Sequence, residues 1–181
     1  MTTLTPANQL TLLRMFLVPA FAILMVYGYF GWALLVFLAA GLTDGLDGLI
    51  ARLSGQRTSL GAWLDPMADK LLILAAFVLL TLPGLGLVNP LPFWLTLLVI
   101  SRDVLIVLTV AVVNLAIGPR TFHPSALGKA ATGIYIVTLT VTLYFNYLRQ
   151  PSPLVDVCVY VALAVTLISG LHYAARVVNA A

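Results

Sequence analysis

Residues 44–69 read DGLDGLIARLSGQRTSLGAWLDPMAD, and this stretch places four aspartates between long apolar runs. Asp44 and Asp47 are three residues apart, and Asp65 and Asp69 are four apart. In helices, these spacings put each pair on one face. The connection between the two pairs is short enough to hold two antiparallel helices side by side. We therefore expect the four carboxylates to converge.

Converging carboxylates repel one another in a low dielectric unless cations neutralise them, and Asp oxygens suit Mg²⁺, Mn²⁺ or Ca²⁺. The pattern thus predicts a site for one or two metal ions. The structural alternative is an ion-pair cluster with Arg52 and Lys70. Small residues nearby, including Gly48 and Gly61, permit close helix approach and leave space for a flat ligand.

The composition indicates a membrane protein. Of 181 residues, 62% are hydrophobic and 8% are charged, whereas soluble domains are roughly 45–50% apolar and about 25% charged. Because about 20 apolar residues cross a ~30 Å hydrocarbon layer, the chain has room for about six spans. We expect a single all-α transmembrane domain over residues 1–181, with the first apolar run retained rather than cleaved as a signal.

Apolar runs separated by glycine, proline and asparagine predict six transmembrane helices. Their predicted ranges are 10–30, 31–52, 60–82, 92–117, 126–148 and 153–179. Aromatic residues near the predicted helix ends form an expected interfacial belt. These residues are Tyr27, Tyr29, Phe30, Trp32, Phe93 and Trp94.

The charge distribution predicts the orientation, because cytoplasmic loops are enriched in Lys and Arg. With both termini inside, most basic residues lie near the cytoplasm and Arg149 is the exterior exception. We expect a multi-pass protein of a bacterial inner membrane with its polar site facing the cytoplasm. The net charge of +3 then reflects orientation and anionic headgroups, and no aromatic and basic tract indicates nucleic-acid binding. Cys158, the single cysteine, cannot form an internal disulfide.

The aspartate stretch resembles the complete defining motif of the CDP-alcohol phosphotransferase family. Eight positions at fixed spacing carry the resemblance. They are Asp44, Asp47, Gly48, Ala51, Arg52, Gly61, Asp65 and Asp69. The resemblance implies a six-helix fold, a homodimer and a polar cavity that binds Mg²⁺ or Mn²⁺, with two ions expected.

The resemblance also implies roles for individual residues. The metal ligands would be Asp44, Asp47, Asp65 and Asp69. Asp69 would in addition act as general base, taking the proton of an acceptor hydroxyl that attacks the donor phosphorus. Three positions would contact the cytidine diphosphate portion of CDP-diacylglycerol, namely Gly48, Arg52 and Thr58.

The acceptor has to be sought outside the motif. Asn8, Thr11 and Arg14 resemble the opening of the branch that makes phosphatidylglycerophosphate and cardiolipin. The run from Asp65 to Lys70 also resembles that branch, which favours a glycerol-based acceptor over inositol phosphate, serine or choline.

Two further basic residues are candidate acceptor contacts. Arg102 and Asp103 form an expensive polar pair within an apolar run, so we expect them to face a cavity. The sequence Ser-Arg-Asp at 101–103 resembles cardiolipin synthases of the eukaryotic type. The alternative is a structural bridge from Arg102 to Asp103 or between helices. Gly128 and Lys129 resemble a residue pair found in the branch that makes phosphatidylglycerophosphate and cardiolipin.

The leading functional prediction is transfer of a phosphatidyl group from CDP-diacylglycerol to sn-glycerol 3-phosphate, with release of CMP. The nearest alternative uses phosphatidylglycerol as acceptor and makes cardiolipin. A cation transporter is an alternative of another class, because intramembrane aspartates also mark ion paths. That alternative gives Gly48, Ala51 and Arg52 no evident use.

Overall fold

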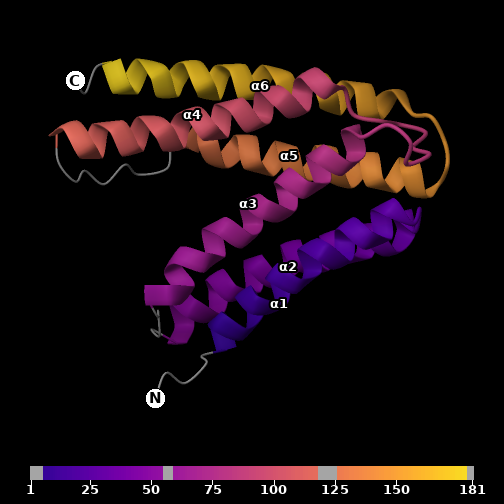
Figure 1. Ribbon diagram of the computed structural model, residues 1–181, viewed down its shortest axis with the longest axis horizontal. Coiled ribbons are helices and arrows are strands. Elements are labelled where there is room, and N and C mark those ends of the chain that lie inside the picture. The colour runs from indigo at the N-terminus through magenta and orange to yellow at the C-terminus, as the bar shows by residue number, and fades with distance from the viewer. Residues whose placement is uncertain (1–5, 55–58, 118–125, 179–181) are drawn as a thin grey trace. The chain divides into compact units, whose positions relative to one another are not determined.

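The protein is all helical in the part of the chain that its structure, a computed structural model, describes. That part comprises residues 6–54, 59–117 and 126–178. Within it, the side chains of residues 6–12, 44–54, 59–69, 110–114, 116, 117, 174 and 176–178 lie outside the description. The helices are α1 (Pro6–Val26), α2 (Phe30–Ser54), α3 (Ser59–Thr81), α4 (Phe93–Ile117), α5 (Ala126–Tyr147) and α6 (Pro153–Val178) (Figure 1).

Each predicted range corresponds to one helix, and local sequence explains several ends. Helix α1 begins at Pro6, where the missing proline N–H is not needed. It ends in a Schellman motif, because Gly28 N donates to Met25 O and Tyr29 N donates to Leu24 O, with Gly28 at φ 76°. This motif ends α1 four residues before the predicted boundary at residue 30.

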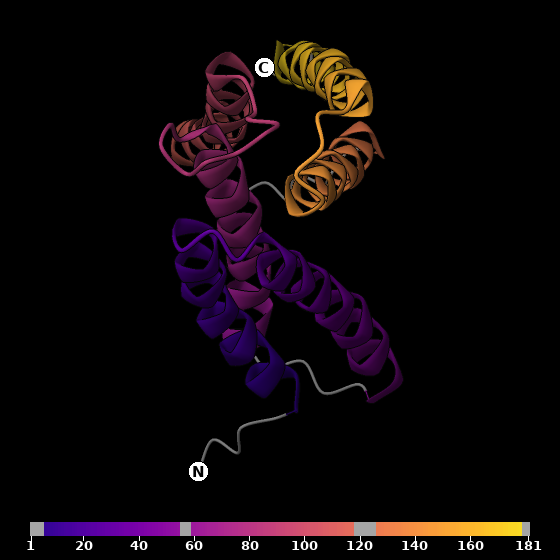
Figure 2. The same ribbon diagram turned by 90° about the vertical axis from the view of Figure 1, so that its right-hand side faces the viewer.

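The chain forms two compact units. The first contains Met1–Pro90 and Thr142–Pro151. Within it, α1 packs against both α2 and α3, and α2 also contacts α3 (Figures 1 and 2). Phe21 of α1 and Phe37 of α2 are buried, and their ring centroids lie 6.0 Å apart. Burial of such aromatic pairs stabilises this group of helices.

The second unit contains Leu91–Val141 and Ser152–Ala181. Here α4 packs against α6. Helix α5 is hydrogen-bonded to α6, because the Tyr135 and Thr166 hydroxyls lie 2.7 Å apart and both side chains are buried. The single domain expected over residues 1–181 stays a prediction.

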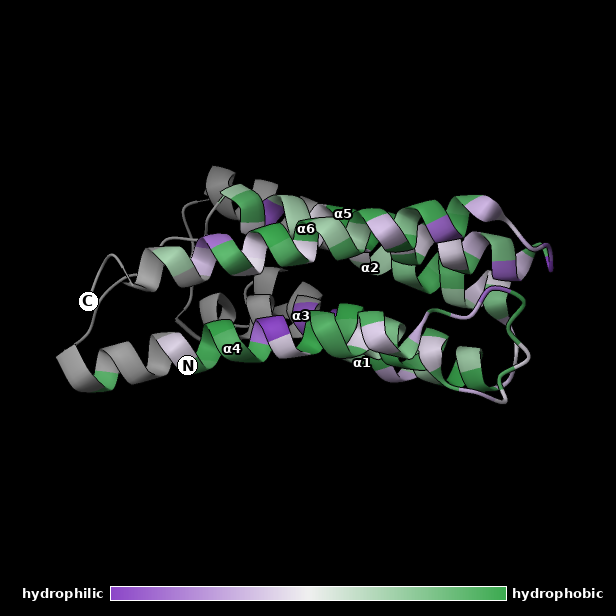
Figure 3. Cartoon of the chain, turned by 90° about the horizontal axis from the view of Figure 1, so that it is seen from above, coloured by the Kyte–Doolittle hydropathy of each residue, from purple (hydrophilic) through white to green (hydrophobic). Residues whose placement is uncertain are grey.

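Apolar surface indicates a membrane environment for these helices. Figure 3 shows hydrophobic residues distributed along the described parts of the helices. Large apolar side chains are exposed, among them Phe16 at 73% and Leu171 at 72%, which a soluble monomer avoids over large areas. Two helical segments in the described chain, Ala126–Tyr147 and Pro153–Tyr173, are long and apolar enough to cross a membrane. Six spans stay a prediction.

The end of α5 is attached to the α3–α4 connection through one buried side chain, that of Asn146. Its Oδ1 accepts hydrogen bonds from Val88 N at 2.8 Å and Asn89 N at 3.0 Å. Its Nδ2 donates to Asn89 O at 3.0 Å and to Thr142 O at 2.9 Å. All the usual hydrogen-bonding capacity of this amide is therefore used.

Replacing Asn146 is therefore expected to destabilise the first unit. Asn146→Ala leaves the buried N–H of Asn89 and the part-buried N–H of Val88 without their partner, which lowers the free energy of unfolding by about 3 kcal/mol. Thermal or denaturant unfolding in detergent measures the change. Gln150→Ala is the matched control, since Gln150 joins this network through its main-chain oxygen. Equal stability of the two variants would contradict the role of Asn146.

Candidate functional site

The eight positions of the signature lie on helices α2 and α3. Asp44 and Asp47 belong to α2, and Asp65 and Asp69 belong to α3. Because the backbone is helical at both pairs, it meets the condition on which the shared-face prediction rests. The side chains of these aspartates and of Arg52 lie outside the part of the chain that the structure describes, as do the surroundings of Gly48 and the whole of Thr58. Their convergence and metal binding stay predictions.

The side chains that the structure does describe give no second candidate metal centre. No group of three or more His, Cys, Asp or Glu residues gathers among them. The residues predicted to bind an acceptor are described, however, and each can be placed on its helix. They are Arg14, Arg102 and Lys129.

Arg14 is a fully buried charge on α1. It precedes the Gly28 turn by 14 residues, and Asp44 follows that turn by 16. At 1.5 Å per residue, the two positions lie about 21 Å and about 24 Å from the turn along their helices. Since α1 packs against α2 and α3, Arg14 lies on the helix that contacts both signature helices. A buried guanidinium requires anionic or strongly polar surroundings, which suits this location.

Arg102 links α4 to α6. Its NH1 donates to Asp103 Oδ1 at 2.6 Å, and its NH2 donates to Ser169 Oγ at 2.5 Å. The Arg102 side chain is 13% exposed, and its buried Nε has no hydrogen-bond partner among the described residues. The bridge to Asp103 that the sequence left as an alternative is thus present.

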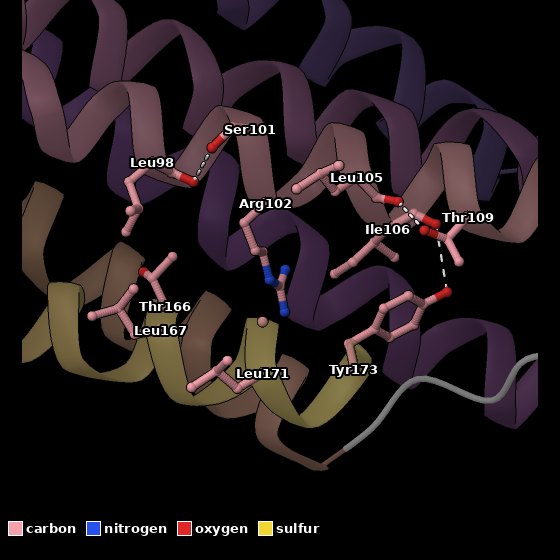
Figure 4. A pocket seen from close by; sticks show the side chains of 11 residues that line it. Leu98, Ser101, Arg102, Leu105, Ile106, Thr109, Thr166, Leu167, Leu171 and Tyr173 are labelled. Carbon is pink, nitrogen blue, oxygen red and sulfur yellow. Dashed lines mark hydrogen bonds between the residues drawn. The ribbon is translucent and has the colours of Figure 1, made fainter. Parts of the chain in front are cut away.

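A cavity with a volume of about 500 Å³ lies beside Arg102, between α4 and α6. That Arg102 and Asp103 face the polar cavity of the active site stays a prediction. Figure 4 shows the Arg102 side chain extending from α4 toward α6 among apolar neighbours. Among the lining residues whose side chains the structure describes, only Arg102 is charged. The apolar ones include Leu98, Leu105, Ile106, Leu167 and Leu171. This combination suits a ligand with one anionic group and an apolar part.

Hydroxyl groups on the cavity lining bond to helix carbonyls. Ser101 donates to Leu98 O at 3.0 Å, and Thr109 donates to Leu105 O at 2.7 Å. Thr166 similarly donates to Ala162 O at 2.6 Å. Such local bonds occupy the hydroxyl protons, so Arg102 is the main donor in the cavity for an anion.

Lys129 lies in the first turn of α5 and is exposed. It precedes Tyr135 by six residues, and Ser169 follows Thr166 by three. Because Tyr135 and Thr166 are hydrogen-bonded, both Lys129 and the Ser169 partner of Arg102 lie toward the same end of the α5–α6 pair. Arg14 belongs to the first unit, so convergence of the three basic residues stays a prediction.

Sequence analysis did not identify Ser169 as a partner of Arg102. The available signal was the small polar pair Ser169-Gly170, which interrupts an apolar run in α6. A polar residue in such a run needs a hydrogen-bond partner. However, the identity of that partner depends on the register between α4 and α6.

The match to known proteins covers most of the chain. The model of the family described as CDP-alcohol phosphatidyltransferase matches residues 4–171. A Mycobacterium tuberculosis protein named "Probable phosphatidylglycerophosphate synthase" is 36% identical, over 94% of this chain and 80% of its own length. The CDP-diacylglycerol–glycerol-3-phosphate 3-phosphatidyltransferase of Bacillus subtilis is 31% identical, over 92% of this chain and 91% of its own length. Human cardiolipin synthase (CMP-forming) is 36% identical, over 79% of this chain and 52% of its own length.

Proposed function

The chain belongs to the CDP-alcohol phosphatidyltransferase family, and from this premise we propose that it transfers a phosphatidyl group from CDP-diacylglycerol to sn-glycerol 3-phosphate. The products are phosphatidylglycerophosphate and CMP. The enzyme therefore acts in phospholipid biosynthesis. The observation that carries this proposal is the eight-position signature, from Asp44 to Asp69, on two helices that pack against each other.

The choice of glycerol 3-phosphate rests on relatives that align over 80% and 91% of their own length. The Mycobacterium tuberculosis and Bacillus subtilis relatives each match more than nine tenths of this chain. The first is named a probable phosphatidylglycerophosphate synthase and the second a CDP-diacylglycerol–glycerol-3-phosphate 3-phosphatidyltransferase. The match to human cardiolipin synthase covers 79% of the chain. Family membership also leaves the cation transporter without support.

The four aspartates of the signature are suitable ligands for divalent cations. Asp44, Asp47, Asp65 and Asp69 supply hard carboxylate oxygens from two packed helices, the chemistry that Mg²⁺ and Mn²⁺ prefer. We assign two ions to these four residues. When bound, the ions screen the pyrophosphate charge and stabilise the departing CMP.

The chain's own residues then divide the remaining work. Asp69 accepts the proton of the acceptor hydroxyl as its oxygen forms a bond to the phosphorus attached to diacylglycerol. The bond from that phosphorus to the CMP oxygen breaks, and CMP leaves with the electron pair. Arg52 supplies fixed positive charge to the phosphates, and Gly48 and Thr58 contact the cytidine diphosphate group.

The acceptor phosphate is bound by Arg14, Arg102 and Lys129 in this proposal. Arg102 has the clearest support, because it is the charged residue of the α4–α6 cavity. Its guanidinium is held by Asp103 and Ser169, which restricts its orientation. A guanidinium fork matches the geometry of phosphate oxygens.

Neutralising Arg102 is expected to weaken acceptor binding selectively. Arg102→Gln should raise the KM for glycerol 3-phosphate by roughly 10–100-fold, since a charge-assisted hydrogen bond contributes about 1.5–3 kcal/mol. The KM for CDP-diacylglycerol should stay close to that of the unchanged protein. Steady-state assays with each substrate varied in turn measure both constants.

Asp103→Asn is the matched variant for this test. It removes the anionic partner of Arg102 at 2.6 Å and keeps the cation in the cavity. If Arg102 serves only the ion pair, the two variants will have the same KM for glycerol 3-phosphate. Acceptor binding requires a larger increase for Arg102→Gln.

A second candidate acceptor is phosphatidylglycerol, which would give cardiolipin. The observation that favours it is the apolar lining around Arg102, which suits an acceptor with acyl chains. Purified protein supplied with CDP-diacylglycerol, Mg²⁺ and equal amounts of the two acceptors decides between them by product mass. Phosphatidylglycerophosphate as main product supports the leading proposal, and cardiolipin as main product overturns it.

The proposal places all six helices across a bacterial inner membrane, with the signature open to the cytoplasm and two copies forming a homodimer. Support for membrane spanning comes from α5 and from Pro153–Tyr173 of α6. Within an 18-residue stretch of each segment only 33% and 28% of residues are buried, whereas a core helix of a soluble protein is mostly buried. Cysteine labelling from each side of the membrane tests the orientation.

A further inference from the structure

A second cavity lies in the first unit, away from the signature end of α2. Its volume is about 470 Å³, and it is lined by residues 28–32, Leu34, Leu35, Tyr147 and Arg149. Asp44 lies 12 residues beyond Trp32 on α2, which is about 18 Å along the helix. The cavity is therefore separate from the catalytic residues.

Arg149 occupies a backbone position that favours glycine. Helix α5 ends in a Schellman motif, because Arg149 N donates to Asn146 O and Gln150 N donates to Phe145 O. Arg149 has φ 56°, in the left-handed region. At the same position of the same motif, α1 has Gly28. A residue other than glycine has a strained backbone in this conformation, so interactions of the Arg149 side chain must compensate for the strain.

The interactions of Arg149 hold its guanidinium at the cavity. NH1 donates to Gly86 O at 2.9 Å, and the guanidinium carbon lies 4.7 Å from the centre of the Phe30 ring. The buried Asn146 side chain joins the end of α5, just before Arg149, to residues 88 and 89, just after Gly86. The backbone at both Arg149 and Gly86 is thereby held in place. The cation is thus positioned before any ligand arrives, which reduces the ordering that binding requires.

The rest of the cavity is shaped by close packing and is apolar or aromatic. A Cβ atom at Gly31 would lie 2.8 Å from carbons of the Tyr147 ring, so only glycine lets this ring lie against α2. Trp32 and Leu35 are 65% and 56% exposed. Among the described lining residues only Arg149 is charged, and its guanidinium has further N–H groups that can donate to an anion.

We propose that this cavity binds an anionic phospholipid, with the phosphodiester on Arg149 and an acyl chain along Trp32 and Leu35. The single positive charge complements one phosphodiester, and arginine with aromatic side chains is typical of the level where headgroups meet hydrocarbon. The described part of the lining contains no carboxylate that could pair with the ammonium group of a zwitterionic lipid. With the six-span arrangement proposed above, the bound lipid lies in the leaflet opposite the signature.

The variant Arg149→Gly tests the role of the positive charge without disturbing the fold. Glycine suits the backbone at position 149, so the variant is expected to fold, whereas the cation is lost. Delipidated protein in detergent is titrated with dioleoylphosphatidylglycerol, and bound lipid is counted by native mass spectrometry alongside thermal unfolding. Relative to the unchanged protein, the variant should need at least about tenfold more lipid for half-saturation of one site and should show a smaller shift of Tm.

The control variant is Gln150→Ala, which should bind the lipid like the unchanged protein. Parallel titrations with dioleoylphosphatidylcholine and with inorganic phosphate should raise Tm much less than phosphatidylglycerol does. With CDP-diacylglycerol as the only added lipid, turnover should be the same in Arg149→Gly as in the unchanged protein, because Arg149 is not assigned to catalysis.

Several outcomes would overturn the lipid site. One is equal lipid affinity of Arg149→Gly and the unchanged protein. Another is equal stabilisation by phosphatidylcholine or by inorganic phosphate alone. A third is a change from dimer to monomer in Arg149→Gly without any loss of lipid, which would make the cavity a contact between two copies.

Discussion

Replacing Asp69 with asparagine is expected to lower turnover by roughly 10²–10⁴-fold, the usual contribution of a positioned general base. The change keeps the size of the side chain, but it removes the proton acceptor and one carboxylate oxygen assigned to metal. Helix α3 carries Asp69 within a continuous helical backbone, so the variant should still fold. CMP release from CDP-diacylglycerol measures the effect, and thermal unfolding in detergent checks the fold.

Asp156→Asn is the matched control for Asp69→Asn. Asp156 lies in the first turn of α6, outside the signature, and is exposed. The same chemical change there should leave turnover near that of the unchanged protein. If Asp69→Asn is folded and loses less than about tenfold in turnover, which is below the usual range for a general base, Asp69 is not the base.

Removing divalent metal is expected to abolish turnover. The four aspartates of the signature repel one another without cations, and the pyrophosphate of the donor then keeps its full charge. Treatment with a chelator, followed by gel filtration, should reduce CMP release to background. Added Mg²⁺ or Mn²⁺ should restore it.

A variant in the signature connects this metal requirement to named residues. Asp44→Asn removes one carboxylate from α2 and should raise the Mg²⁺ concentration for half-maximal activity by at least about tenfold. Mn²⁺ binding to the chelated protein, followed by electron paramagnetic resonance, gives a readout that does not depend on turnover. Unchanged Mn²⁺ binding in Asp44→Asn would contradict the assignment.

The helices could be predicted from the sequence because breakers separate six long apolar runs. The largest boundary difference is at α1, which spans Pro6–Val26 instead of the predicted 10–30. Two local features explain it. Pro6 suits a helix start although the residues around it are polar, and Gly28 adopts φ 76° in a C-terminal motif. Apolar periodicity alone contains neither feature.

The sequence allows more detailed predictions for the CDP-diacylglycerol site than for the rest of the protein, because the residues of the signature are close together in sequence. Contacts between distant segments could not be predicted. The Arg102–Ser169 bond joins residues 67 positions apart, and the Asn146–Val88 bond joins residues 58 apart. Such pairs depend on helix register and on side-chain rotamers, which the sequence does not display as a pattern. Arg149 was predicted only as an exterior charge, whereas its left-handed backbone depends on how α5 ends.

The most direct test of the proposed function is CMP release by purified protein, with the lipid product identified by mass. With CDP-diacylglycerol, glycerol 3-phosphate and Mg²⁺ present, we predict equal amounts of CMP and phosphatidylglycerophosphate. Omitting either the acceptor or the metal should stop the release of both. CMP release that continues without any acceptor, or no CMP release by folded protein under the complete conditions, would contradict the assignment of this chain as a phosphatidyltransferase acting on glycerol 3-phosphate.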